Sequence, residues 1–91
     1  MMQRTRVLYS GHVQGVGFRA TTRGLAGNYD VVGYVKNLSD GRVELLVEGD
    51  KTDIAALLKA VERELGRHIS DRVRHDETIL KPRHSSFDIA R

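Results

Sequence analysis

The sequence predicts an α+β fold of the split βαβ type, in which an antiparallel sheet carries two helices on one face. The first observation is a hairpin, because two β-rich runs within residues 31–49 flank the turn Ser39-Asp40-Gly41. The second is an amphipathic helix after the hairpin, with apolar residues at helical spacing. The third is the order of elements: strand, helix, strand, strand, helix, strand, and a short extra C-terminal strand.

The segment before the hairpin predicts a strand and a weaker helix. Residues 4–11, "RTRVLYSG", alternate in the manner of a strand. Residues 19–29 place apolar side chains on one helical face, but Gly24 and Gly27 each weaken a helix by about 1 kcal/mol relative to alanine. This helix must therefore depend on tertiary packing.

The hairpin and the second helix have clearer patterns. Apolar side chains alternate with charged ones in residues 42–48, which predicts one buried and one solvated face. Asp50 or Thr52 can cap the following helix, and Gly66 can end it. The core-facing positions of this helix are Ile54, Leu57, Leu58, Val61 and Leu65.

The C-terminal part predicts two strands. Residues 71–80 have moderate strand character, Pro82 breaks the run, and residues 85–91 alternate as a short final strand. With both helices on one face, the other face of the sheet is expected to be open to solvent.

Composition limits the classes of function. Residues 1–91 are expected to form a single domain, with 40% hydrophobic and 30% charged residues. The absence of cysteine excludes disulfides, a thiol nucleophile and a zinc–thiolate site. The start "MMQRTRVLYSG" lacks the apolar run of a signal peptide, and no segment reaches membrane-spanning length. A cytoplasmic monomer with no membrane partner is therefore expected.

Net charge does not separate the remaining classes. Fifteen basic residues against twelve acidic ones give a formal charge of +3. A small anionic substrate or a nucleic acid would both fit this excess. The aromatic-rich strand motifs of RNA-binding domains are not present, so we expect no nucleic-acid partner.

The stretch "GHVQGVGFR", residues 11–19, joins the first strand to the first helix. Its glycines allow positive φ values, so successive backbone N–H groups can point into one concavity. The helix N-terminus adds further N–H groups, and Arg19 adds a guanidinium suited to two phosphate oxygens. The stretch fits neither the Rossmann nor the Walker spacing. It is either a simple corner or a cradle for a tetrahedral anion, and its context favours the cradle.

Asn37 is a second candidate, at the end of the hairpin's first strand. Asparagine before a turn commonly serves turn chemistry. In a split βαβ sheet, however, the first strand lies beside the hairpin's second strand. The hairpin should therefore lie close to the glycine-rich loop, where the Asn37 amide can donate and accept hydrogen bonds.

Together, "GHVQGVGFR" and "GYVKNLSDGRVELLVEGD" resemble the signature of the acylphosphatase family, and the ending "FDIAR" is also of the family type. The resemblance spans essentially the whole chain. It implies a ferredoxin-like fold (βαββαβ) and hydrolysis of the carboxyl–phosphate bond of a small acyl phosphate. It also implies that Arg19 and the backbone N–H groups of residues 14–19 hold the phosphoryl group while Asn37 orients the attacking water. The implied cradle consists of Gln14, Gly15, Val16, Gly17, Phe18 and Arg19.

The residues themselves are compatible with this chemistry. The sequence has no convincing nucleophile–base pair, paired carboxylates or metal motif, and the resemblance implies neither a metal nor a cofactor. A carboxylate leaving group needs no general acid, so positioning and electrostatic stabilisation suffice. The alternatives are a non-catalytic anion-binding regulatory module, a nucleic-acid-binding module of the same fold, and a domain tuned to carbamoyl phosphate.

Overall fold

A computed structural model describes residues 2–91 and contains two α-helices, five strands and one short 3-10 helix in that range. The elements follow one another as β1 (Met2–Gly11), α1 (Phe18–Ala26), β2 (Val31–Asn37), β3 (Val43–Asp50), α2 (Lys51–Leu65), η1 (Gly66–His68), β4 (Ile69–Thr78) and β5 (Phe87–Ala90). The predicted βαββαβ order with an extra C-terminal strand is confirmed.

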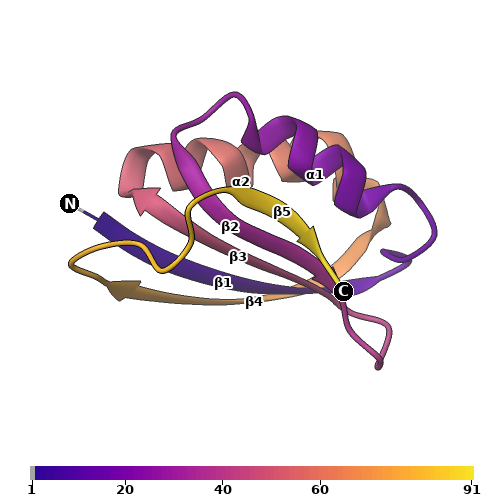
Figure 1. Ribbon diagram of the computed structural model, residues 1–91. Coiled ribbons are helices and arrows are strands. Elements are labelled where there is room, and N and C mark those ends of the chain that lie inside the picture. Colours follow the sequence, from indigo (N-terminus) through magenta and orange to yellow (C-terminus); the bar gives the residue numbers. More distant parts are fainter. Residues whose placement is uncertain (1) are drawn as a thin grey trace.

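The strands form one sheet in the order β4-β1-β3-β2-β5. Both helices lie on the same face of this sheet (Figure 1). β1 and β3 are antiparallel neighbours, with Tyr9 opposite Val43, so the first strand does lie beside the hairpin. The sheet is not purely antiparallel as predicted, because β5 pairs parallel to β2. The connection after β4 crosses the sheet to the opposite edge, where β5 pairs with β2 and runs in the same direction.

The core lies between the sheet and the two helices. Its sheet side is made by alternate residues of the three central strands, and its helix side mainly by α2. The spacing of three and four in α2 therefore reflects core packing, as predicted. The fully buried members include Val35, Val43, Leu45, Val47, Ile54, Leu57 and Val61.

The other face of the sheet is partly covered, contrary to the prediction. Glu48 is fully buried there, and its carboxylate accepts hydrogen bonds from the backbone N–H groups of Arg83 (3.0 Å) and His84 (3.0 Å). Arg4 Nε donates to the same carboxylate at 2.7 Å, and His84 Nδ1 lies 2.9 Å from it. The segment before β5 thus folds over this face and is held by one buried carboxylate.

These contacts change the pKa of Glu48. Burial alone would raise the pKa, but hydrogen bonds from the His84 side chain, the backbone N–H groups of Arg83 and His84, and Arg4 outweigh it. Together they lower the pKa from 4.5 to about 2. Glu48 is therefore a charged structural group inside the fold.

Several element boundaries differ from the predictions. α1 ends at Ala26, three residues before the predicted end at Tyr29, and Gly27 follows it as the C-cap. β4 begins at Ile69 and ends at Thr78, two residues earlier at each end than predicted. Asp50 occupies the N-cap position of α2. Within residues 2–91, no helix combines the length and the apolar character needed to cross a membrane.

Candidate active site

The connection between β1 and α1 is shaped by two glycines. Gly15 and Gly17 have φ values of 78° and 77°, whereas Val16 between them does not have a positive φ. Alternating backbone signs of this kind turn successive N–H groups toward one side. A Cβ at either glycine would meet nothing within 4 Å, so both face open space. Gly17 is also the N-cap of α1, whose first N–H groups lack intrahelical partners.

The loop is anchored to the core immediately before and after these glycines. Val13 is fully buried, and Phe18 is 2% exposed with its ring centre 5.3 Å from that of Tyr9. Burial raises the pKa of the Tyr9 hydroxyl well above its usual value, so Tyr9 stays neutral at physiological pH. The first turn of α1 is therefore fixed to β1, which positions the neighbouring Arg19.

Gln14 joins this loop to the β2–β3 hairpin. Its Nε2 donates hydrogen bonds to the backbone carbonyls of Leu38 (2.8 Å) and Arg42 (3.0 Å). Leu38 directly follows Asn37, so the contact sets the distance between the loop and the end of β2. We assign this crosslink to the side chain of Gln14, whereas the sequence suggested only its backbone N–H.

A cavity of about 660 Å³ lies between the loop, the start of α1 and the ends of β2 and β5. That volume is within the range of about 300–1,000 Å³ typical of ligand sites. Five of the predicted site residues line it, whereas Gln14 and Val16 are not among its walls. The lining residues are Val13, Gly15, Gly17, Phe18, Arg19, Ala20, Asn37, Ile89, Ala90 and Arg91.

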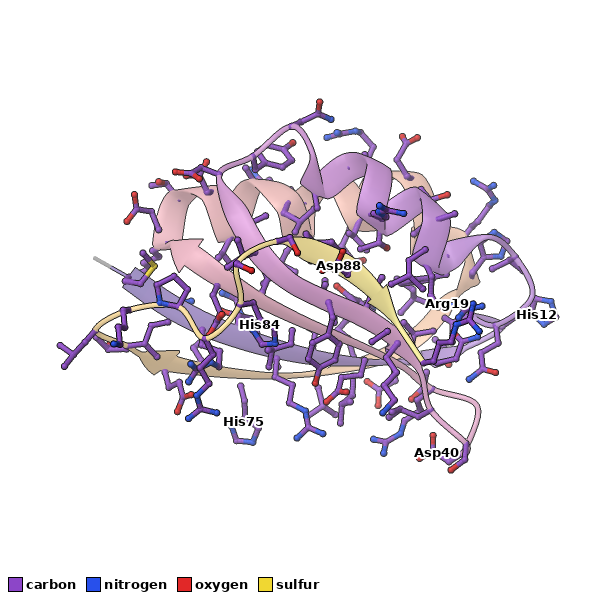
Figure 2. The ribbon with its side chains drawn as sticks, viewed as in Figure 1. His12, Arg19, Asp40, His75, His84 and Asp88 are labelled. Carbon is purple, nitrogen blue, oxygen red and sulfur yellow. The ribbon has the colours of Figure 1, made fainter. Side chains whose placement is uncertain are left out.

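Arg19 and Asn37 line this cavity, and the described residues give neither side chain a partner. Among residues 2–91, no side-chain hydrogen bond or ion pair involves the Arg19 guanidinium or the Asn37 amide. Figure 2 shows Arg19 at the end of the molecule where the hairpin turn with Asp40 projects. A half-buried arginine and an amide are thus available to an anion at this site.

The hairpin turn does not need Asn37. The Asp40 carboxylate accepts a hydrogen bond from the Arg42 backbone N–H at 3.1 Å and pairs with the Arg42 guanidinium at 2.9 Å. The Leu38 N–H donates to the Arg42 carbonyl at 2.8 Å and closes the turn. Turn chemistry therefore explains Asp40, and the cavity explains the position of Asn37.

Comparison with known proteins agrees with this arrangement. The acylphosphatase family model matches residues 5–89, which include the loop, the hairpin and most of β5. The chain belongs to the acylphosphatase family. A crystal structure of acylphosphatase from Bacillus subtilis superposes with a TM-score of 0.86 and 32% identity over 100% of both chains. A structure from Coxiella burnetii has a TM-score of 0.82 and 31% identity, covering 98% of this chain and 93% of its own.

The curated relatives match over a shorter length. An acylphosphatase from Methylococcus capsulatus is 49% identical over 57 residues, which are 63% of this chain and 62% of that relative. The chain therefore aligns with a little under two thirds of that acylphosphatase.

The candidate cavity has one wall that the sequence did not indicate. Ile89, Ala90 and Arg91 line it because β5 runs parallel to β2, so the chain end reaches the same edge of the sheet as Asn37. The glycine loop was recognisable as a candidate phosphate cradle. The contribution of Arg91 was not, because it depends on a strand pairing that has no local sequence signal.

A larger cavity of about 840 Å³ lies between α2 and β4. Its lining includes Leu58, Lys59 and Arg72, but none of the predicted site residues. Size alone does not make this groove the candidate active site, because it lacks the glycine loop. In the described part of the chain, no group of three or more His, Cys, Asp or Glu side chains is placed to hold a metal ion.

Proposed function

We propose that the protein hydrolyses acyl phosphates to a carboxylate and inorganic phosphate. One observation carries the proposal: the Arg19 guanidinium and Asn37 amide, which have no side-chain partner among residues 2–91, share a cavity with the positive-φ glycines Gly15 and Gly17. A guanidinium beside a helix N-terminus is suited to a phosphoryl dianion. The acylphosphatase names of the relatives support the same reaction.

In this proposal the phosphoryl group is bound by Arg19 and by backbone N–H groups of residues 14–19. Two of its oxygens would accept from the guanidinium, and the others from the loop and the first turn of α1. The acyl group would point toward the open side of the cavity. Arg91, at the mouth formed by β5, is placed to meet it.

Asn37 is proposed to hold the attacking water. The water oxygen bonds to phosphorus, the bond from phosphorus to the carboxylate oxygen breaks, and the carboxylate leaves with the electron pair. The water proton passes to a phosphate oxygen. Because the leaving group is a weak base, the chain needs to supply only alignment and stabilisation of the anionic transition state.

A substitution of Asn37 tests its role separately from phosphate binding. Asn37→Ala should lower kcat by roughly 10²–10³-fold, the loss typical of one preorganised polar group. The inhibition constant for inorganic phosphate should stay within a factor of about three, since phosphate is held elsewhere in the site. Asn28→Ala, an exposed asparagine beyond α1, is the control and should change neither value.

The rival functions predict different outcomes. An anion-binding regulatory module would bind phosphate through Arg19 without turnover in the wild type. A nucleic-acid-binding module would show affinity that falls steeply with salt. A carbamoyl phosphate domain would hydrolyse that substrate and reject benzoyl phosphate.

The proposal includes four finer points. The protein acts as a single domain over residues 1–91, as a monomer in the cytoplasm, and without nucleic acid. Sedimentation equilibrium tests the oligomeric state, and a filter-binding assay at low salt tests nucleic-acid binding.

A further inference from the structure

Two histidines lie opposite each other just beyond the β1–β4 ladder. Ser10 pairs with Asp71, but the next pair is Gly11 with Ile69, so a β-bulge shifts the register by one residue. Continuing from the shifted pair brings His12 opposite His68. Without the bulge, His12 would instead face Ile69.

Gly11 makes this arrangement possible. Its φ is 125°, and a Cβ there would lie 2.5 Å from the backbone oxygen of His68 and 2.7 Å from the Ser70 nitrogen. The two backbones are therefore in close contact, which fixes the histidine Cα atoms relative to each other. His12 and His68 themselves lie outside the ladder, in the loop after β1 and in η1.

The two imidazoles are near the separation of a chelating pair. Their ring centres are 6.5 Å apart at an interplanar angle of 43°. With metal–nitrogen bonds of about 2.0–2.1 Å, two imidazoles on one tetrahedral ion would have ring centres roughly 5 Å apart, and on a linear one roughly 6.4 Å. His12 is exposed and His68 half-buried, so a side-chain rotation of His12 can close the difference.

We propose that His12 and His68 form a binding site for a late first-row divalent cation such as Ni²⁺, Cu²⁺ or Zn²⁺, with water completing the coordination. Imidazole nitrogen favours these ions over Mg²⁺ and Ca²⁺. The separation of the two histidines in the sequence matches no metal motif, because the pair forms between the loop after β1 and η1. The site is separate from the proposed hydrolysis, in which no metal participates.

Metal at this site would tie the start of the glycine loop to η1. His12 is two residues from Gln14, whose side chain holds the loop to the hairpin. A bound ion should therefore stabilise the folded chain, because only the fold brings the two imidazoles together. Figure 2 shows His12 at the same end of the molecule as Arg19, whereas His75 lies below the sheet, on the side away from the helices.

The test is a calorimetric titration of the whole chain with Ni²⁺ in a non-chelating buffer. The variants are His12→Gln, His68→Gln, the double variant and His75→Gln as the matched control. We expect one ion per chain, at least tenfold weaker binding in each of the first two, and no change in the control. Because chelation needs both rings, the double variant should lose little more than either single one. Mg²⁺ should give no binding.

The proposal would be overturned if the losses of Ni²⁺ affinity in the two single variants added up in the double variant. An equal loss of affinity in His75→Gln would overturn it too, because Ni²⁺ would then bind independent surface histidines. A wild type that binds no Ni²⁺ would do the same. If His68→Gln does not fold, NMR of the histidine imidazole signals of the wild type tests whether His12 and His68 bind the ion. Trace Ni²⁺ should broaden the His12 and His68 signals before those of His75 and His84, and broadening of all four together would contradict the site.

Discussion

The Gln14 crosslink leads to a prediction that links loop geometry to turnover. Gln14→Met keeps the approximate shape of the side chain and removes both hydrogen bonds to the hairpin carbonyls of Leu38 and Arg42. Each carbonyl keeps a second donor: the Gly41 N–H reaches the Leu38 oxygen at 3.2 Å, and the Leu38 N–H reaches the Arg42 oxygen at 2.8 Å. The substitution therefore leaves neither acceptor without a partner.

The size of the stability loss follows from that count. A net hydrogen bond contributes about 0.5–1.5 kcal/mol, and an unpaired buried acceptor would add a further penalty. Since no acceptor is orphaned, Gln14→Met should lower the free energy of unfolding by about 1–2 kcal/mol. Urea denaturation followed by far-UV circular dichroism measures this value.

The effect on activity should exceed what stability explains. Without the crosslink, the loop proposed to hold the phosphoryl group is no longer fixed relative to Asn37. A displacement of about 1 Å between reacting groups can cost on the order of 10²-fold in rate. We therefore expect kcat/KM for benzoyl phosphate to fall by at least about tenfold at a temperature where the variant is fully folded.

Gln3 provides the matched control, at the far end of β1 from the loop. Its Nε2 also makes two hydrogen bonds, to Thr5 Oγ1 at 2.8 Å and Asp76 Oδ1 at 3.1 Å. Gln3→Met should cost comparable stability and leave kcat/KM unchanged. If Gln14→Met loses no more activity than Gln3→Met, the crosslink does not position the site.

Three further substitutions test the scaffold. Glu48→Gln should lower the free energy of unfolding by about 3 kcal/mol at neutral pH. This value follows because folding lowers the pKa of Glu48 from 4.5 to about 2, and one pKa unit corresponds to about 1.4 kcal/mol. Because this pKa is depressed in the fold, the stabilisation is present above pH 4.5 and lost as the pH falls toward 2, so wild type and variant should converge in urea titrations across that window. A gap that stays constant there would contradict the charged, buried assignment. Gly33→Ala should destabilise by about 2 kcal/mol or more, since its Cβ would lie 2.0 Å from the Leu46 carbonyl oxygen at a φ of 139°. Gly24→Ala, inside α1 with nothing within 4 Å, should stabilise by up to about 1 kcal/mol, and thermal melts that rank the two alanine variants otherwise would be inconsistent with the packing.

The elements with regular periodicity were predictable from the sequence. The hairpin and α2 follow from alternation and from spacings of three and four, since both patterns record which face is buried. The sequence signal for α1 was weaker because its glycines disfavour a helix. Its end at Ala26 depends on where tertiary packing stops. The pairing of β5 with β2 could not be read locally, because strand partners are chosen by the whole sheet.

Glu48 shows why alternation can mislead. A glutamate between apolar residues of a strand is normally interpreted as solvent-facing. The residues that cover Glu48 are Arg83 and His84, which lie 35 and 36 positions further along the chain. Nothing periodic marks that covering segment. Because this segment covers Glu48, a face that was predicted to be solvated contains a buried ion pair instead. In this pair, Arg4 Nη2 lies 2.7 Å from Glu48 Oε2.

The residues of the candidate site were more predictable than the contacts that surround and position them. Arg19 and Asn37 were chosen from their motifs, and the sheet order places them on one cavity. The two contributions that escaped prediction, the Gln14 crosslink and the Arg91 wall, depend on long-range contacts between segments with no shared pattern. Roles assigned to Arg19 and Asn37 in turnover stay predictions until kinetics test them.

The most direct test is hydrolysis of benzoyl phosphate by the purified protein in excess EDTA, beside Arg19→Ala. Arg23→Ala is the control, because Arg23 is exposed on the same helix one turn later. We predict turnover that survives the chelator, vanishes in Arg19→Ala and persists in Arg23→Ala. A folded wild type without turnover, or an Arg19→Ala variant with unchanged kinetics, would contradict the assignment of the glycine loop as a phosphoryl-binding active site.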